Sequence, residues 1–338
     1  MKKLTLILVL ILAASMAFAG AKKEDTGLPW VPEKPITIIV PWSAGGSTDQ
    51  LARIIAGEIE DPLGQKIVIQ NQPGASGSVG SQSCLDAPRD GYTWTAGAAV
   101  DIGVYKILGL IDSQIEDWNL FLGVANVMIV SVNPDSPYQT FDDLMAAFKA
   151  KPGQVSVATA GQSSAGHIAM EIIKKYTGVE YKMIPYDGGN PAVIATVAGE
   201  AEVVTQLAVE QADMLRAGKL RALAVLSDTD MNMKGVGVIP SIKKWLPEYA
   251  TGPNYFGIWT PKGVPEEVIE TFSILWEKYI VNSQVIKDYA DERGAIFTPH
   301  WGEDAQERAM SYISPVAWLY YDAGKAKASP ETIGISRP

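Results

Sequence analysis

Hydrophobic residues along the chain follow two spacings, the short runs typical of strands and the period of three to four residues typical of helices. Residues 36–40 form a β-branched apolar run that ends at Pro41, which predicts a strand. Apolar residues then recur at helical spacing from Leu51 to Ile59, which predicts a helix. The small-residue loop between them, residues 42–49, therefore leads a strand into the first turn of a helix.

The same alternation continues along the chain. Further strands are predicted at residues 66–70, 92–96, 154–159, 181–185, 202–207, 220–226 and 255–260. Further helices are predicted at residues 141–150, 168–176, 191–199, 210–217, 265–281, 283–292 and 303–321. Thr140 with Asp143 resembles a capping box, and Asn190 with Pro191 is expected to start a helix as N-cap and first residue. Strands that alternate with helices predict an α/β protein with parallel sheets and ligand loops at the carboxyl ends of the strands.

Two segments depart from this alternation. Residues 121–133 form a nearly continuous apolar run that is longer than one ordinary strand, and we expect it to cross between two domains. Residues 228–253 contain several glycines and prolines with little periodicity, and we expect them to lie across the surface. We therefore predict one domain from residues 34–128 plus 255–338 and a second from residues 129–254.

The loop at residues 42–49 is a candidate anion site. The first amides of a helix have no intrahelical partner and lie at the positive end of the helix dipole. Ser47, Thr48 or Asp49 is expected to cap this helix, and a plain connection between strand and helix is the simpler alternative. A second small-residue loop, residues 160–166, repeats the arrangement, and two such loops together favour a clamp around a ligand.

Composition indicates a large exported protein. The chain has 338 residues, 47% of them hydrophobic and 20% charged, which is enough for two domain cores. Residues 1–19 predict a secretory signal peptide, with a basic start, an apolar centre and a small-residue cleavage pattern that ends at Ala19. Residues 20–33 follow as a polar leader. Because no cysteine follows the cleavage site, we expect a periplasmic protein without a lipid anchor.

The charge balance excludes some classes of partner. Loss of Lys2 and Lys3 with the signal peptide changes the formal net charge from −10 to about −12, which argues against nucleic acid and anionic membrane surfaces. A small anion is still compatible, since screening at physiological salt acts over about 8 Å. Cys84 is the only cysteine, so no intramolecular disulfide can form.

Two short motifs suggest chemistry that their surroundings do not support. The glycines of residues 74–80 are spaced GxxGxxG, and no acidic residue follows at the distance that a dinucleotide site needs. Residues 161–165 come close to the GxSxG nucleophile elbow, but Ala165 stands where glycine is wanted and His167 would lie on the same helix as the serine. No cysteine and histidine cluster indicates a metal site. We expect no cofactor and no enzymatic activity.

Several segments, taken together, resemble the solute receptors of tripartite tricarboxylate transporters, the TctC or Bug family. In family order they are PWSAGGSTDQLAR, LGQKIVIQNQPGASGSVG, PRDGYT, ATAGQSSAGH, PYDGG, GKLRALAVLS and GIWTPKGVP. The resemblance implies a type II periplasmic binding-protein fold of two lobes, each a sheet flanked by helices, with the ligand in the cleft between them. It also implies a small organic carboxylate as ligand and membrane permease subunits as partners.

The resemblance carries the ligand-binding positions of the family onto this chain. They are Trp42, Ser43, Ala44, Gly45, Gly46, Ser47, Thr48, Gly97, Ala98, Ala160, Gly161, Gln162, Ser163, Ser164, His167, Tyr186, Asp187, Gly188 and Gln206. The chain departs from the family at Trp42, where phenylalanine is usual, at residues 161–164, where GNGS is usual, and at Gln206, where an aspartate often stands. Loss of that acid weakens the case for an ammonium-bearing ligand and leaves a di- or tricarboxylate or an aromatic acid at least as well supported.

Several roles stay open at this stage. No arginine or lysine lies in the candidate loops, so amides, hydroxyls, helix dipoles and water would meet the charge of a carboxylate. Trp42 either walls the pocket or packs between strand and helix, and His167 is expected as a neutral structural imidazole. A monomeric ligand sensor that reports to a signalling partner is an alternative to a monomeric transport receptor, and a secreted serine hydrolase is an alternative from another class.

Overall fold

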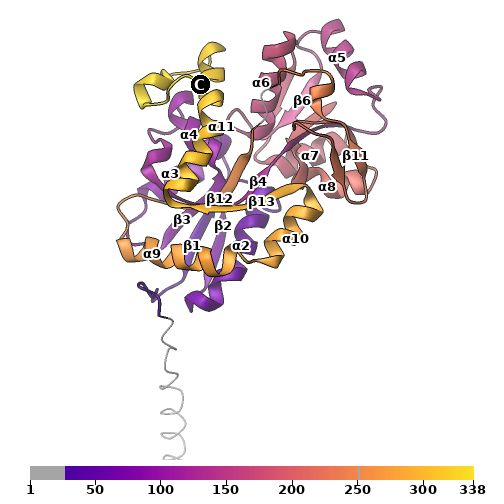
Figure 1. Cartoon of the computed structure of the whole chain (residues 1–338). Helices are drawn as coiled ribbons and strands as arrows, with labels where there is room; N and C mark the ends of the chain where they lie inside the picture. Colours follow the sequence, from indigo (N-terminus) through magenta and orange to yellow (C-terminus); the bar gives the residue numbers. More distant parts are fainter. Residues whose placement is uncertain (1–26, 250–251) are drawn as a thin grey trace, which may run out of the picture.

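In the computed structural model, which describes residues 27–249 and 252–338, the chain forms two sheets with helices packed on them (Figure 1). Lobe 1 is the half around a six-stranded sheet of order β13-β4-β12-β3-β1-β2. Its strands are β1 (Ile36–Val40), β2 (Ile67–Asn71), β3 (Thr93–Ala98), β4 (Trp118–Asn126), β12 (Asn254–Pro261) and β13 (Ala295–Trp301). Lobe 2 is the half around a five-stranded sheet of order β7-β6-β8-β5-β9. Its strands are β5 (Met128–Val132), β6 (Ser156–Thr159), β7 (Lys182–Pro185), β8 (Val203–Leu207) and β9 (Arg221–Val225).

The helices divide between the same two halves. Those of lobe 1 are α2 (Ser47–Leu63), α3 (Ser78–Asp86), α4 (Ala99–Leu108), α9 (Glu266–Leu275), α10 (Gln284–Arg293) and α11 (Gly302–Asp322). Those of lobe 2 are α5 (Phe141–Ala150), α6 (Ala165–Thr177), α7 (Gly189–Val197) and α8 (Ala208–Arg216). Short 3-10 turns are η1 (Ala75–Gly77), η2 (Ile115–Asp117), η3 (Ile242–Lys244) and η5 (Pro330–Ile333), and the turn η4 (Trp276–Ile280) is π-helical. The α/β class with two helix-flanked sheets is therefore confirmed.

The direction of the strands differs in part from the parallel sheets that the alternation predicts. Strands β1, β2 and β3 are parallel, as are β6, β7 and β8. Strands β12 and β13 run antiparallel to β4, and β5 runs antiparallel to both of its neighbours. The reason is the path of the chain, since β4 and β5 carry it out of lobe 1 and β12 brings it back.

The chain leaves lobe 1 over a single residue. Strand β4 ends at Asn126 and β5 begins at Met128, so only Val127 separates two strands that belong to different sheets. On its return the chain enters β12 at Asn254, which pairs with Asn126. The apolar run at residues 121–133 is thus two strands, one in each sheet. The predicted domain limits at residues 128 and 255 stay predictions as limits of independent units.

Aromatic side chains fill the core of lobe 1. The rings of Trp94 and Phe272 stack with centroids 3.9 Å apart, and Phe121 packs edge-on against Trp276 at 5.2 Å. The indole of Trp276 also donates to the carbonyl of Leu122 at 2.8 Å, so its polar atom is satisfied in the core. This tryptophan begins the π-helical turn, and the single long helix predicted at residues 265–281 is wrong in that detail.

Other predictions of local structure had mixed outcomes. The capping box of Thr140 and Asp143 is confirmed by hydrogen bonds in both directions. Asn190 is not an N-cap, because the helix already begins at Gly189. The surface segment at residues 228–253 contains a small antiparallel hairpin of β10 (Met231–Met233) and β11 (Gly237–Ile239). Strand β13 and helix α4 are not among the predicted elements.

The predicted signal peptide, residues 1–19, lies outside the described residues. The described part of the leader is held on lobe 1, because the amide of Trp30 donates to the hydroxyl of Thr271 at 2.8 Å. In the part of the chain that the structure describes, every helix is too short or too polar to cross a membrane.

Candidate ligand-binding cleft

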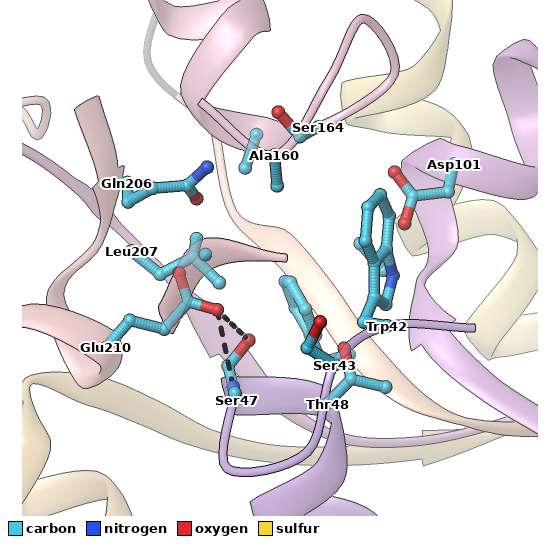
Figure 2. A pocket seen from close by; sticks show the side chains of 15 residues that line it. Trp42, Ser43, Ser47, Thr48, Asp101, Ala160, Ser164, Gln206, Leu207 and Glu210 are labelled. Atoms are coloured by element: carbon cyan, nitrogen blue, oxygen red, sulfur yellow. Dashed lines mark hydrogen bonds between the residues drawn. The ribbon is translucent and has the colours of Figure 1, made fainter. Parts of the chain in front are cut away.

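A cleft between the two lobes collects residues from both, and predicted and unpredicted positions line it together (Figure 2). The predicted residues that line it are Trp42, Ser43, Gly46, Ser47, Thr48, Ala98, Ala160, Ser164 and Gln206. The lining residues that were not predicted are Asp101, Ala165, Gly189, Leu207, Glu210 and Phe256. The remaining predicted residues, Ala44, Gly45, Gly97, Gly161, Gln162, Ser163, His167, Tyr186, Asp187 and Gly188, are not part of this lining.

Helix N-termini converge on the cleft. The lining includes the N-cap or the first residue of α2 (Gly46 and Ser47), α4 (Ala98), α6 (Ser164 and Ala165), α7 (Gly189) and α8 (Leu207). Each of these ends carries amides without intrahelical partners and the positive end of a dipole. Helix ends therefore contribute a large part of the lining, and two acids, Asp101 and Glu210, contribute to it as well.

The loop that precedes α2 is held in place by a charged residue in the first turn of that helix. Asp49, in the first turn of α2, accepts from the amide of Gly45 at 2.9 Å and pairs with Arg53 at 2.9 Å. Burial acts to raise the pKa of Asp49, but hydrogen bonds from Arg53, Gly45 and Asn71 lower it below its usual value. Gly46, and not one of the three polar residues predicted for the role, is the N-cap of α2, and it offers no side chain to the helix end.

A carboxylate of lobe 2 occupies the uncapped end of α2. Oε1 of Glu210 accepts from the Ser47 hydroxyl at 2.9 Å and from the Ser47 amide at 3.3 Å, as the dashed lines in Figure 2 show. With its amide turned to satisfy both neighbours, Gln206 donates to Oε2 of Glu210 at 3.2 Å and accepts from the amide of Ala160 at 2.7 Å. Burial raises the pKa of Glu210, against the hydrogen bonds from Ser47 and from the Leu207 amide.

A second acid, Asp101, faces the cleft from lobe 1. It lies in the first turn of α4 and is only 4% exposed, and its Oδ1 has no hydrogen-bond partner. Burial raises the pKa of Asp101 well above its usual value, although the Ala98 amide and the side chains of Ser163 and Trp42 act in the opposite direction. Figure 2 shows this carboxylate beside the indole of Trp42, which forms one wall of the cleft.

The two lobes touch directly around the cleft. The amide and hydroxyl of Ser43 both donate to the carbonyl of Asp187, at 3.0 and 2.8 Å. On another side, Ser76 of lobe 1 accepts from the Gln162 amide at 3.1 Å and from the Ser163 hydroxyl at 2.9 Å. The space in the cleft that water can occupy is about 30 Å³, which is room for one or two water molecules. A larger solute would need more room than this arrangement of the lobes leaves.

The second loop forms this lobe contact more than it forms the cleft. Ser76 has a left-handed backbone with φ of 57°, an unusual conformation for serine, at the point where it meets lobe 2. Gly161 has no room for a Cβ, which would lie 2.4 Å from the Ser76 hydroxyl. The carbonyl of Gln162 accepts from the Tyr320 hydroxyl at 2.5 Å. The glycines of residues 74–80 thus shape a loop that rests on lobe 2.

His167 lies away from the cleft, in a separate cavity that Glu171, Tyr181 and Lys325 also line. Its Nδ1 is 3.0 Å from the hydroxyl of Tyr181, and burial lowers its pKa to about 4, although Glu171 acts to raise it. It is a neutral imidazole at physiological pH. Because the Ser163 hydroxyl donates to Ser76 and His167 turns to Tyr181, these two residues do not form the pair that a serine nucleophile needs.

Sequence reasoning missed both acids of the cleft for one reason. Asp101 and Glu210 each occupy the third position of a helix that follows a strand. Acids are common there because they complement the helix dipole, so the position alone does not indicate a ligand site. The available signal was that both helices follow loops already predicted to reach the ligand. Among the described residues, no group of three or more histidine, cysteine or acidic side chains is arranged to hold a metal ion.

Known proteins are similar to this chain in sequence and in fold. Protein BugT of Bordetella pertussis is 31% identical over 284 residues, which cover 83% of this chain and 85% of that protein. The structure of the periplasmic binding protein BugD superposes with a TM-score of 0.80 at 23% identity, over 88% of this chain and 100% of that chain. An R. palustris protein solved with adipate superposes with a TM-score of 0.77 at 26% identity, over 87% and 98% of the two chains.

The resemblance to the TctC or Bug family is thus confirmed, and so is the periplasmic binding-protein fold. The family model for the tripartite tricarboxylate transporter family receptor, TctC, matches residues 51–297, which is most of the chain. The chain belongs to this family of transporter receptors.

Proposed function

We propose that this protein is a periplasmic receptor that captures a small organic carboxylate between its lobes and delivers it to the membrane permease subunits of a tripartite transporter. The di- and tricarboxylates and aromatic acids expected from the sequence are the solute classes to test first. The receptor acts by binding and release, and its lobes rotate between open and closed arrangements.

The convergence of helix N-termini from both lobes on one cleft supports this proposal most directly. Such ends bind carboxylates without a basic side chain, and none lines this cleft in the described chain. Glu210 demonstrates the chemistry, because its own carboxylate sits at the end of α2. The relative solved with adipate is a second support, since it shares the fold at 26% identity.

The contacts between the lobes bear on how a solute would be exchanged. Hydrogen bonds such as those of Ser43 with Asp187, of Ser76 with Gln162 and of Ser47 with Glu210 join the lobes. Each is worth about 1 kcal/mol net. A solute that bridges the lobes would add contacts of this kind and favour closure.

A thermal-shift screen of the mature protein tests the proposal. The panel contains di- and tricarboxylates, aromatic acids, amino acids, a neutral sugar and a cationic amine. At least one carboxylate should raise the melting temperature, because a ligand that binds only the folded state stabilises it by about 2.7 kcal/mol at a hundred times its Kd. If only the sugar or the amine raises the melting temperature, the proposal is wrong.

A further inference from the structure

The residues around the side chain of Glu210 accommodate a carboxylate. Its Oε1 takes two hydrogen bonds from Ser47 at the end of α2, as described above. A Cβ on Gly189, the first residue of α7, would lie 1.8 Å from Oε2, and a Cβ on Gly46 would lie 3.6 Å from Oε1. The glycine at the start of α7 is thus required for this carboxylate to fit, and the best anion position of the cleft already holds a charge of the protein.

Asp101 adds a second acid, and one of its two carboxyl oxygens lacks a hydrogen bond. Its Oδ1 is buried without a hydrogen bond, and its carboxylate faces the same cleft from lobe 1 (Figure 2). Elsewhere the chain pairs its buried acids with cations, as in Asp49 with Arg53 at 2.9 Å and Glu171 with Lys325 at 2.6 Å. A buried polar atom without a partner is costly, so a solute group that hydrogen-bonds to Oδ1 of Asp101 would be favoured in the cleft.

We infer that the solute is a carboxylic acid that also carries an amino group, and that Glu210 selects it over the diacid of the same length. This inference rests on the proposed function and narrows its solute class. An ammonium group brings three hydrogen-bond donors for acceptors such as Glu210 or Asp101, whereas a second carboxylate brings only further acceptors to a cleft that already contains two acids. The carboxylate of the solute still has the remaining helix ends around the cleft.

Glu210 also supplies an acid near the end of β8, where the family often carries one. Gln206 stands where the family often carries aspartate, which weakened the case for an ammonium-bearing ligand. Glu210 follows one helical turn later and is hydrogen-bonded to Gln206 at 3.2 Å. The negative charge is therefore still present in the cleft, supplied by the helix and not by the strand.

Isothermal titration with matched pairs of acids tests this selection. In each pair an amino group replaces one carboxylate at constant chain length, as in glutarate with 4-aminobutanoate and adipate with 5-aminopentanoate. Aspartate and glutamate are added beside succinate and glutarate. For the length that binds best, the amino-bearing member should bind wild-type protein at least tenfold more tightly than the plain diacid.

The Glu210→Gln variant should lose this preference or reverse it, and Asp101→Asn should weaken binding of the amino-bearing member. Glu200→Gln is the matched control, because Glu200 is an exposed glutamate of the same lobe outside the cleft. Circular dichroism checks that each variant is folded. If Glu210→Gln does not fold, the ratio of the Kd values of the diacid and its amino-bearing partner in wild-type protein alone tests the inference.

Three results would overturn the inference. Wild-type protein could bind the diacid as tightly as its amino partner, or Glu210→Gln could leave the ratio unchanged. Glu210→Gln could also tighten binding of every acid equally, which would make Glu210 a competitor of the solute and not its selector. If no carboxylic acid of either kind binds, the proposed function fails as well, whereas binding without preference overturns only the selection.

Discussion

The helix ends of α2 and α6 look alike in sequence and differ in structure. Each follows a strand and a small-residue loop, yet α2 has Gly46 as a bare N-cap, while α6 is capped by the Ser164 hydroxyl, which accepts from the His167 amide at 3.4 Å. The end of α2 is completed from the other lobe by Glu210, and the end of α6 largely by its own residues. The end of α2 is thus closed by a contact between the lobes, and the end of α6 by its own cap.

The third residue of each helix deepens this contrast. In α2 it is Asp49, whose pKa is lowered below its usual value, and in α6 it is His167, whose pKa burial lowers to about 4. Between pH 6.5 and 4 the aspartate stays charged. In the same range His167 is protonated in the unfolded chain and neutral in the folded chain. Acid should therefore weaken the α6 joint first.

The largest expected effect is this loss of stability with acid. The folded pKa of His167 lies about 2.5 units below the ordinary value of about 6.5, so its contribution is full above pH 6.5 and falls by about 3 kcal/mol by pH 4. Glu171, whose Oε1 is 4.0 Å from Nε2, acts to raise the pKa of His167, and Lys325 and Lys174 act to lower it. Urea unfolding of wild type and His167→Gln at pH 7 and pH 4.5 measures it. An equal loss in both proteins would assign the acid sensitivity to other groups.

A smaller effect is expected on affinity when the bare end of α2 is blocked. In Gly46→Val the new Cβ lies 3.4 Å from the Ser43 carbonyl and 3.6 Å from Glu210, and its methyls extend into the cleft. These methyls would crowd Glu210, and the loss of one charge-assisted hydrogen bond that Glu210 makes with the solute, about 1.5–3 kcal/mol, corresponds to a roughly ten- to hundredfold weaker Kd. Calorimetry with the ligand found in the screen gives the number.

The matched control for this variant is Gly57→Val on the same helix, where a Cβ meets nothing within 4 Å. The φ of −74° at Gly46 suits any residue, so the change of affinity does not come from a strained backbone. Unchanged affinity in Gly46→Val would remove the end of α2 from the binding site.

The smallest expected effect is the change in the free energy of unfolding when the N-cap residue of either helix is replaced. Ser164→Ala removes the side chain that caps α6 and should lower the free energy of unfolding by about 1 kcal/mol. Gly46→Ser supplies a cap that α2 lacks and should raise it by a few tenths of a kcal/mol. Chemical denaturation of both variants measures whether the free energy of unfolding falls in Ser164→Ala and rises in Gly46→Ser. Changes of the same sign would mean that the two helix ends are equivalent after all.

The features that could be predicted from the sequence are those that depend only on residues close to one another along the chain. The periodic runs placed most strands and helices within one or two residues, and the Thr140 capping box needs only four consecutive residues. Helix α4 escaped prediction because nearly all of its residues are buried, which leaves no polar face to mark a period. Strand β13 escaped because it is a half-buried edge strand that contains Pro299.

The cleft was predictable only in part, for a physical reason. The backbone loops around Gly46 and Ala160 were predicted because strand, small residues and helix follow one another directly. Asp49, Asp101 and Glu210 all sit third in a helix, and the sequence gives them the same appearance. In the structure Asp49 pairs with Arg53, Asp101 keeps one oxygen without a hydrogen bond, and Glu210 accepts from Ser47. These differences depend on what each helix packs against, and that is a property of the tertiary fold.

The one-residue passage at Val127 has a consequence for the thermodynamics of closure. With Asn126 and Asn254 paired side by side where β4 ends and β12 begins, the lobes are joined along a narrow line and cannot drift apart as free bodies. Their relative motion is reduced to a swing about that line. Closure then gives up the entropy of roughly one angle, and not the translational and rotational freedom that two separate partners lose. More of the free energy of contact with the solute is left as affinity, even for a molecule of only a few carbon atoms.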